Sequence, residues 1–160
     1  MRHTNRALLV IIAGALLLIT IAVVVVLVRP PPSYRSETSP ADIVSNYLLA
    51  LQRGDSARAY GYLSPTLRSY PPSAADFVAD MAHTEGDAAS TYEVLDTPIR
   101  DTRAVVTVRA TTFVHGGLLS NGQSVRTFTM TLANESGVWR LVNSDDWTVW
   151  RDCWNRRGGC

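Results

Sequence analysis

Side chains able to carry out acid–base chemistry are few in this sequence and widely separated. A catalytic acid or base must lie within hydrogen-bond reach of its substrate and have a pKa tuned by its surroundings. The candidates for the mouth of a pocket are Tyr60, Tyr62, His83, His115, Asp145 and Asp146. Each also has a structural interpretation: surface or loop positions for the histidines, a polar turn for the aspartates, and core packing with the hydroxyl at the rim for the tyrosines. We therefore predict no catalytic residue.

Metal and cofactor chemistry lack their usual sequence patterns. The spacing of the histidines matches no metal-binding motif, and there is no HExxH, CxxC or carboxylate cluster. All 15 basic residues are arginines, which excludes a Schiff-base lysine, a lysine general base and a Walker-type phosphate loop. A formal net charge of +1 argues against nucleic-acid binding. We expect no metal, no cofactor and no nucleic-acid partner.

The C-terminal tail, residues 150–160, combines tryptophan, arginine and cysteine. Cys153 and Cys160 fit a small disulfide loop in an oxidising compartment. An intermolecular bond and two free thiols are the alternatives. We expect Trp154, inside the loop, to be exposed and available to lipid headgroups or a partner protein, because aromatic and arginine side chains are enriched at both kinds of surface.

Residues 7–28 carry no charged side chain. As a helix this run would be ~33 Å long, enough to cross a hydrocarbon core of ~30 Å. We predict a single transmembrane helix; a cleaved signal peptide and a buried core helix are the alternatives. Arginines on the two sides of the run nearly balance. We place residues 1–6 in the cytoplasm and the rest outside the cell membrane, because so short a head is easily left behind and both cysteines lie in the long C-terminal part.

Residues 29–39, RPPPSYRSETS, predict a proline-stiffened linker. Helix signals follow it. Ser39 and Pro40 predict a helix start, and Gly54 its end. Asp55 caps a second short helix, and Ser73 a third.

After Gly86 the apolar period changes from 3.6 residues to 2, which predicts antiparallel strands. Asn121-Gly122 is a strong signal for a hairpin turn. The helices would lie across the apolar face of the sheet. The predicted fold class is therefore α+β, with an N-terminal transmembrane helix followed by three helices on a curved antiparallel sheet.

Several short motifs follow one another in a familiar order: Leu51-Gln52-Arg53-Gly54-Asp55, Ala59-Tyr60, Leu63-Ser64-Pro65, a Ser-capped third helix, and Gly137-Val138-Trp139-Arg140-Leu141. In this order they resemble the nuclear-transport-factor-2-like superfamily over residues 40–147. The resemblance implies a cone of three helices on a curved sheet with a pocket between them, and a domain over residues 40–149. Since the superfamily includes isomerases, hydrolases, transport adaptors and secretion scaffolds, the fold says little about activity.

One face of the predicted sheet is rich in threonine and arginine. We assign to it the interface candidates Arg109, Arg126, Thr127 and Thr129. A solvated sheet face has this composition. The resemblance implies a second possibility, because members of the superfamily dimerise through this surface. A protein partner or a homodimer on the exposed sheet face is therefore expected alongside the membrane.

Three functions are compatible with these observations. The first is a non-enzymatic, membrane-anchored extracytoplasmic module that binds a partner protein or a small apolar ligand at the cell envelope. The second is a pocket enzyme of the isomerase or hydrolase type, and the third is a scaffold subunit of a membrane protein complex. Convergent titratable groups in an open pocket would favour the enzyme. A filled or wholly apolar cone would favour binding or scaffolding.

Overall fold

The computed structural model describes residues 2–28, 32–82, 90–115, 121–158 and 160. The chain forms two compact units, Met1–Ser33 and Tyr34–Cys160. The first contains a single helix, α1 (Arg2–Val28), whose described side chains, at residues 11–24, are all exposed. In the portion of the chain that the structure describes, no helix combines the length and apolarity that a membrane crossing requires.

The second unit begins with three helices, at the positions that the sequence predicts: α2 (Pro40–Arg53), α3 (Ser56–Gly61) and α4 (Ala74–Met81). Ser39, Asp55 and Ser73 act as N-caps, each accepting a hydrogen bond from a backbone N–H of the first turn. Gly54 ends α2 in the left-handed conformation, with φ of 66°, which glycine adopts without steric cost.

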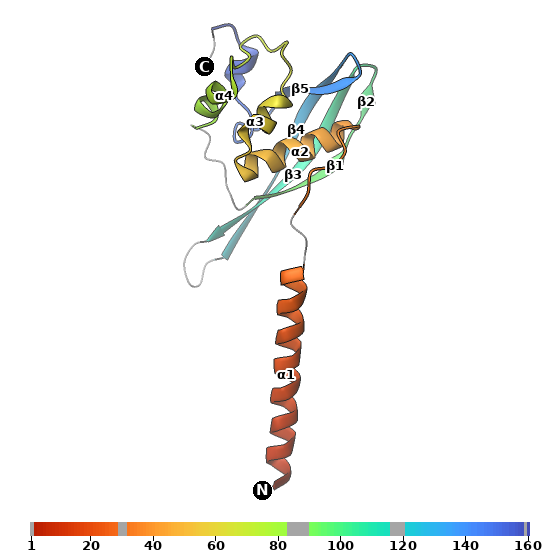
Figure 1. Cartoon of the computed structure of the whole chain (residues 1–160), viewed down its shortest axis with the longest axis vertical. Coiled ribbons are helices and arrows are strands. Elements are labelled where there is room, and N and C mark those ends of the chain that lie inside the picture. The colour runs from red at the N-terminus through yellow and green to blue at the C-terminus, as the bar shows by residue number, and fades with distance from the viewer. Residues whose placement is uncertain (1, 29–31, 83–89, 116–120, 159) are drawn as a thin grey trace. The chain divides into compact units, whose positions relative to one another are not determined.

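An antiparallel sheet follows, made of β1 (Ser90–Asp96), β2 (Ile99–Arg100), β3 (Arg103–His115), β4 (Asn121–Glu135) and β5 (Val138–Ser144). The strand order is β1-β3-β4-β5, and β2 pairs with β3. Figure 1 shows α2 crossing the sheet, while the ends of β3 and β4 next to residues 116–120 extend beyond the three helices. The α+β prediction is confirmed: helices pack on an antiparallel sheet.

The predicted hairpin turn at Asn121-Gly122 is wrong. Both residues belong to β4, where they pair with His115 and Val114 of β3. β3 therefore ends at His115 and β4 begins at Asn121, and residues 116–120 between them lie outside the described residues. The turn-forming chemistry of the Asn-Gly pair is overridden here by continued strand pairing.

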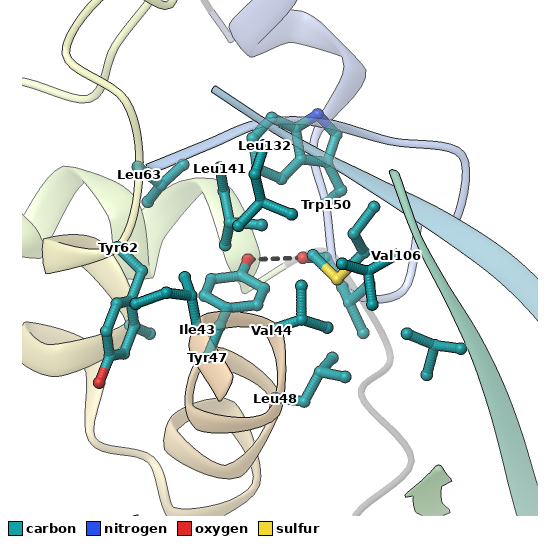
Figure 2. Close-up of a cluster of buried hydrophobic side chains, with 14 of the residues drawn as sticks. Ile43, Val44, Tyr47, Leu48, Tyr62, Leu63, Val106, Leu132, Leu141 and Trp150 are labelled. Atoms are coloured by element: carbon teal, nitrogen blue, oxygen red, sulfur yellow. Dashed lines mark hydrogen bonds between the residues drawn. The ribbon is translucent and has the colours of Figure 1, made fainter. Parts of the chain in front are cut away.

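The two faces of the sheet differ in burial. Alternate residues of β3 and β4 are buried under the helices: Ala104, Val106, Val108, Ala110, Phe128, Met130 and Leu132. Figure 2 shows Tyr47 of α2 among buried side chains that include Leu132, Leu141 and Trp150, with its hydroxyl donating to the Val149 carbonyl at 2.6 Å. We call the helix-covered side the inner face and the opposite side the outer face.

The second unit is longer than the predicted 40–149 domain at both ends. Residues 34–39, assigned to the linker, belong to it, and Asn46 fixes them by accepting from the Arg35 N–H at 2.7 Å and donating to the Arg35 carbonyl at 3.0 Å. At the other end, Trp150 and Trp154 are fully buried. The tail is therefore part of the hydrophobic core and not an exposed extension of the domain.

Candidate functional site

Side chains of the described residues pack into the space between the helices and the inner face. The largest of them are aromatic: Tyr47, Phe77, Phe128, Trp150 and Trp154. The Trp154 ring meets Trp150 edge-on at 4.9 Å between centroids and stacks on Phe77 at 5.5 Å. Burial raises the pKa of the Tyr47 phenol far above its ordinary value, so Tyr47 stays neutral and serves as a hydrogen-bond donor.

A hollow of about 590 Å³ lies at the rim of the sheet, where β4 continues past the end of β5; we call it the rim hollow. It is lined by Arg126, Thr127, Phe128, Asp145, Asp146, Trp147 and Thr148. The structure thus brings two pocket candidates, Asp145 and Asp146, together with two interface candidates, Arg126 and Thr127.

The polar groups of the rim hollow are engaged with one another. Arg126 Nε donates to Asp146 Oδ2 at 2.7 Å, and its Nη2 donates to Thr148 Oγ1 at 2.8 Å. The other carboxylate oxygen of Asp146 accepts from the Thr148 N–H and hydroxyl, at 2.8 and 2.6 Å. Asp146 is buried, and a buried carboxylate must be paired in this way. Its contacts hold a turn and a strand together.

Asp145 bonds the backbone of β4 at Thr129, the position just beyond the last residue that β5 pairs. Its carboxylate accepts from the Thr129 N–H at 2.7 Å and from the Thr129 hydroxyl at 3.0 Å, while its own N–H donates to the Thr129 carbonyl at 3.2 Å. The two aspartates therefore form the polar turn of the structural interpretation. Among the described residues, no three histidine, cysteine or acidic side chains gather as a metal site.

The assignment of Arg126 to the outer face is wrong. Arg126 pairs with Ala110 across the ladder, and Ala110 is a buried inner-face residue. Cross-strand partners share a face, so Arg126 lies on the inner face, where Asp146 binds it. Its parity with Phe128 could have revealed this, but its charge favoured a solvent position.

The remaining interface candidates do lie on the outer face. Arg109 pairs with Thr127 across the β3–β4 ladder, and Thr129 with Thr107. The Arg109 guanidinium donates to Glu93 at 3.0 Å, both side chains being well exposed. Large apolar side chains are exposed on this face as well, among them Val105, Phe113 and Val125. The outer face is therefore more apolar than its threonines alone indicated.

The two tyrosine candidates contact residues that do not line the rim hollow. Tyr60 donates to the Pro71 carbonyl at 2.9 Å, and its ring lies 5.2 Å from that of Tyr70. Tyr62 donates to Glu37 Oε1 at 2.7 Å. That bond, with the nearby Arg58 guanidinium, lowers the pKa of the Glu37 carboxyl, and burial raises the pKa of Tyr62.

Sequence reasoning missed a cluster around Tyr34. The ring of Tyr34 lies under two guanidinium groups, 3.8 Å from Arg58 and 5.0 Å from Arg53. Its hydroxyl donates to Asp55 Oδ2 at 3.0 Å. We call these four residues the Tyr34 clamp. It fastens the chain that follows the first unit to α2 and α3.

The histidine candidates remain untested. His83 lies outside the described residues. The backbone of His115 ends β3, opposite Asn121, but its side chain is not among those described. Neither can be assigned to a site.

The tail cysteines and Trp154 have different outcomes. Cys153 and Cys160 form the predicted intrachain disulfide, with a Cα–Cα distance of 5.2 Å. The expected exposure of Trp154 is wrong: its indole is fully buried, and its Nε1 donates to Asp80 Oδ2 at 2.7 Å. The exposed tryptophan is Trp147, at the rim hollow, with 61% of its surface accessible.

Solved structures share this fold. A SEC-C motif containing protein from Rhodopseudomonas palustris is 18% identical with a TM-score of 0.51, over 69% of this chain and 80% of that chain. A candidate calcium/calmodulin-dependent protein kinase type II association domain from Thiobacillus denitrificans is 13% identical with a TM-score of 0.50, over 71% of this chain and 95% of that chain. At these identities the likeness is one of fold alone.

The neighbours also include a protein of the superfamily that the sequence resembles. An NTF-2 like protein of unknown function from Shewanella oneidensis is 10% identical with a TM-score of 0.45, over 64% of this chain and 90% of that chain. No family profile and no curated protein matches the sequence. The class that fold and site define is therefore an α+β domain of helices packed on an antiparallel sheet.

Proposed function

We propose that this chain is a non-enzymatic, single-pass membrane-anchored module whose domain lies outside the cell membrane and binds a partner protein through the outer face. The observation that carries the proposal is the contrast between the two faces. The inner face is buried under the helices and their aromatic side chains, whereas the outer face leaves Val105, Phe113 and Val125 exposed. Exposed apolar side chains within a polar surface are typical of protein contact sites.

The membrane anchor is proposed from the uncharged sequence that α1 contains, because the described helix by itself does not meet the requirements of a membrane span. Residues 7–28 have no charge, and the 27 residues of α1 form one helix, which is ~40 Å long at the standard rise. The extracytoplasmic side is supported by the Cys153–Cys160 disulfide, because such bonds persist in oxidising compartments.

The anchor is tested by protease accessibility in cells with a permeabilised outer envelope. Added protease should remove the second unit and leave α1 in the membrane. Protection of the second unit, together with failure of a membrane-impermeant reagent to reach Cys153 and Cys160 after reduction, contradicts the proposed side. Deleting residues 7–28 should abolish the cellular role while the second unit keeps its fold.

The outer face is tested by a matched pair of charge substitutions. Val105→Glu places a charge on the outer face, and Val78→Glu places one on α4; the wild-type residues are 39% and 46% exposed. In a deletion strain, Val105→Glu should fail to complement and should lose its partner in cross-linking from native membranes, whereas Val78→Glu should behave as wild type. Full function of both variants contradicts partner binding on this face. If the cross-linked partner is a second copy of this chain, the outer face forms a face-to-face homodimer instead of binding a different protein.

The enzyme alternative retains one testable place, the rim hollow. Asp145→Asn keeps an oxygen acceptor for Thr129, so the turn should survive. If this variant folds and reaches the membrane but fails to complement, the rim hollow must be treated as an active site. Copy number in a purified native complex separates a binding module from a scaffold subunit, which is present at a fixed ratio to its neighbours.

A further inference from the structure

Two of the edges of the sheet are covered or interrupted. Along β5, the chain at Tyr62–Ser64 pairs with Leu141: the Ser64 N–H donates to the Leu141 carbonyl at 2.8 Å, and the Leu141 N–H donates to the Tyr62 carbonyl at 2.9 Å. Along β1, the register shifts between Val94 and Asp96. β1 also carries the charged side chains of Glu93 and Asp96. A bulge and charged side chains on an edge strand hinder the addition of another strand.

The third edge is open. β5 pairs with β4 only over Met130–Glu135, and Asp145 occupies the next position at Thr129. β4 continues to Asn121 with β3 on one side only. Among the described residues, nothing pairs with the other side of β4 over residues 121–128, which we call the open edge.

The backbone groups that face the open edge can be identified. Thr129 uses its N–H and carbonyl toward Asp145, away from β3. Alternate residues of a strand direct these groups to the same side, so those of Gln123, Val125 and Thr127 also face the open edge. No described residue bonds them, and all three side chains are exposed.

The open edge lacks the features that protect β1. Residues 121–125 are Asn-Gly-Gln-Ser-Val, with no charge and no proline. The nearest charge, Arg126, is turned to the inner face and bound to Asp146. On the outer face, Val125 lies diagonal to Phe113, and these side chains are 55% and 48% exposed. Trp147 lies beside Thr127 in the rim hollow.

The geometry points to a second copy of this chain as the occupant: two open edges pair antiparallel about a two-fold axis at Val125, joining two sheets into one. In this register Val125 lies opposite itself and Gln123 opposite Thr127. Each facing pair exchanges two hydrogen bonds, so the three pairs form about six. Because no charge opposes a like charge, the segment is complementary to itself.

An axis at Thr127 satisfies fewer groups. It would place Val125 opposite Thr129, whose edge groups Asp145 already uses. The register at Val125 pairs Gln123, Val125 and Thr127 and brings the apolar Val125 and Phe113 of both copies together on the outer face. The outer faces of the two copies then form one continuous surface. The dimer does not depend on the proposed anchor or on the proposed partner.

A single-cysteine comparison in native membranes tests this register. Val125→Cys lies on the axis, where antiparallel partners have a Cα–Cα distance of ~5.5 Å, within the range of a disulfide. Mild oxidation should give a covalent dimer that reducing agent dissolves. Val105→Cys is the matched control, because this position is exposed on the outer face of β3 and away from the open edge. It should give at least 10-fold less covalent dimer than Val125→Cys.

The outcomes are distinct. A dimer through Val105→Cys but not Val125→Cys would place the contact on the outer face and overturn the edge proposal. Cross-linking of Val125→Cys to a different polypeptide would show that a strand of another protein pairs with the open edge. No cross-linking of Val125→Cys would show that no strand pairs there. Either result overturns the proposal that a second copy of this chain occupies the open edge.

A second variant measures the association itself. Val125→Lys places like charges opposite each other on the axis, while its side chain remains at an exposed outer-face position. For the detergent-solubilised full chain, analytical ultracentrifugation should give a dimer dissociation constant at least 10-fold higher for this variant than for wild type. The circular dichroism spectrum should be unchanged. A monomeric wild type, or a variant that dimerises equally well, overturns the proposal.

Discussion

Arg126 of β4 and Asp146 of the turn after β5 are joined at 2.7 Å between Nε and Oδ2, with side-chain exposures of 32% and 5%. The carboxylate also holds Thr148 through two hydrogen bonds. Removing Arg126 would leave a buried charge without its cation. Charged hydrogen bonds are typically worth 1.5–3 kcal/mol, so we expect Arg126→Ala to lower the free energy of unfolding by about 2 kcal/mol, measured by urea denaturation followed by tryptophan fluorescence.

The matched control for this pair is Asp152→Asn. Asp152 and Arg156 are 3.7 Å apart with both side chains more than two-thirds exposed, and such surface pairs contribute little. The control should change stability by less than about 0.5 kcal/mol. Equal effects of the two substitutions would mean that the Arg126–Asp146 pair is no stronger than a solvated one.

Local signals in this sequence predict local structure well. Ser39, Asp55 and Ser73 are caps whose partners lie within the next turn, so the helix starts are encoded in adjacent residues. The alternation along β3 likewise identifies the buried face. The Asn121-Gly122 signal failed because strand pairing, a non-local effect, decided where the hairpin turns.

Contacts between residues far apart in the chain could not be predicted from the sequence. The burial of Trp154 depends on Phe77, Trp150 and Asp80, and nothing in the tail itself indicates them. The Tyr34 clamp joins residues 19 or more positions apart in the same way. The rim hollow combines candidates from two separate groups, because β4 and the turn after β5 meet only in the folded sheet.

The Tyr34 clamp should control access to the start of the second unit. Tyr34→Ala removes the ring beneath Arg53 and Arg58 and the bond to Asp55. We expect trypsin to cleave after Arg35 at least 5-fold faster in this variant, because the segment loses its attachment and opens locally. Tyr34→Phe keeps the ring and should stay close to wild type; equally fast cleavage in both variants would assign the attachment to the hydroxyl alone.

Glu37 should contribute stability that disappears in acid. The hydrogen bond from Tyr62 and the Arg58 guanidinium hold the pKa of Glu37 below its ordinary value of 4.5. A carboxyl with a lowered folded-state pKa stabilises above its unfolded pKa, and this contribution is lost as pH falls through the folded value. Wild type should therefore be more stable than Glu37→Gln at pH 7, and the difference should shrink below pH 4.5. A difference independent of pH would contradict the ionic contribution.

The buried Trp154 yields the last prediction, because it links α4 to the disulfide loop. Its indole stacks on Phe77 and donates to Asp80, so Trp154→Ala removes both a core aromatic and a polar bond and should cost about 3–5 kcal/mol. Trp154→Phe keeps a ring at this position and should cost less than half as much. Opening the loop with Cys153→Ser and Cys160→Ser should cost roughly 2–3 kcal/mol from loop entropy. Denaturation of each full-length variant gives these differences. A Trp154→Ala variant as stable as wild type would place the indole at the surface, in conflict with its burial in the core.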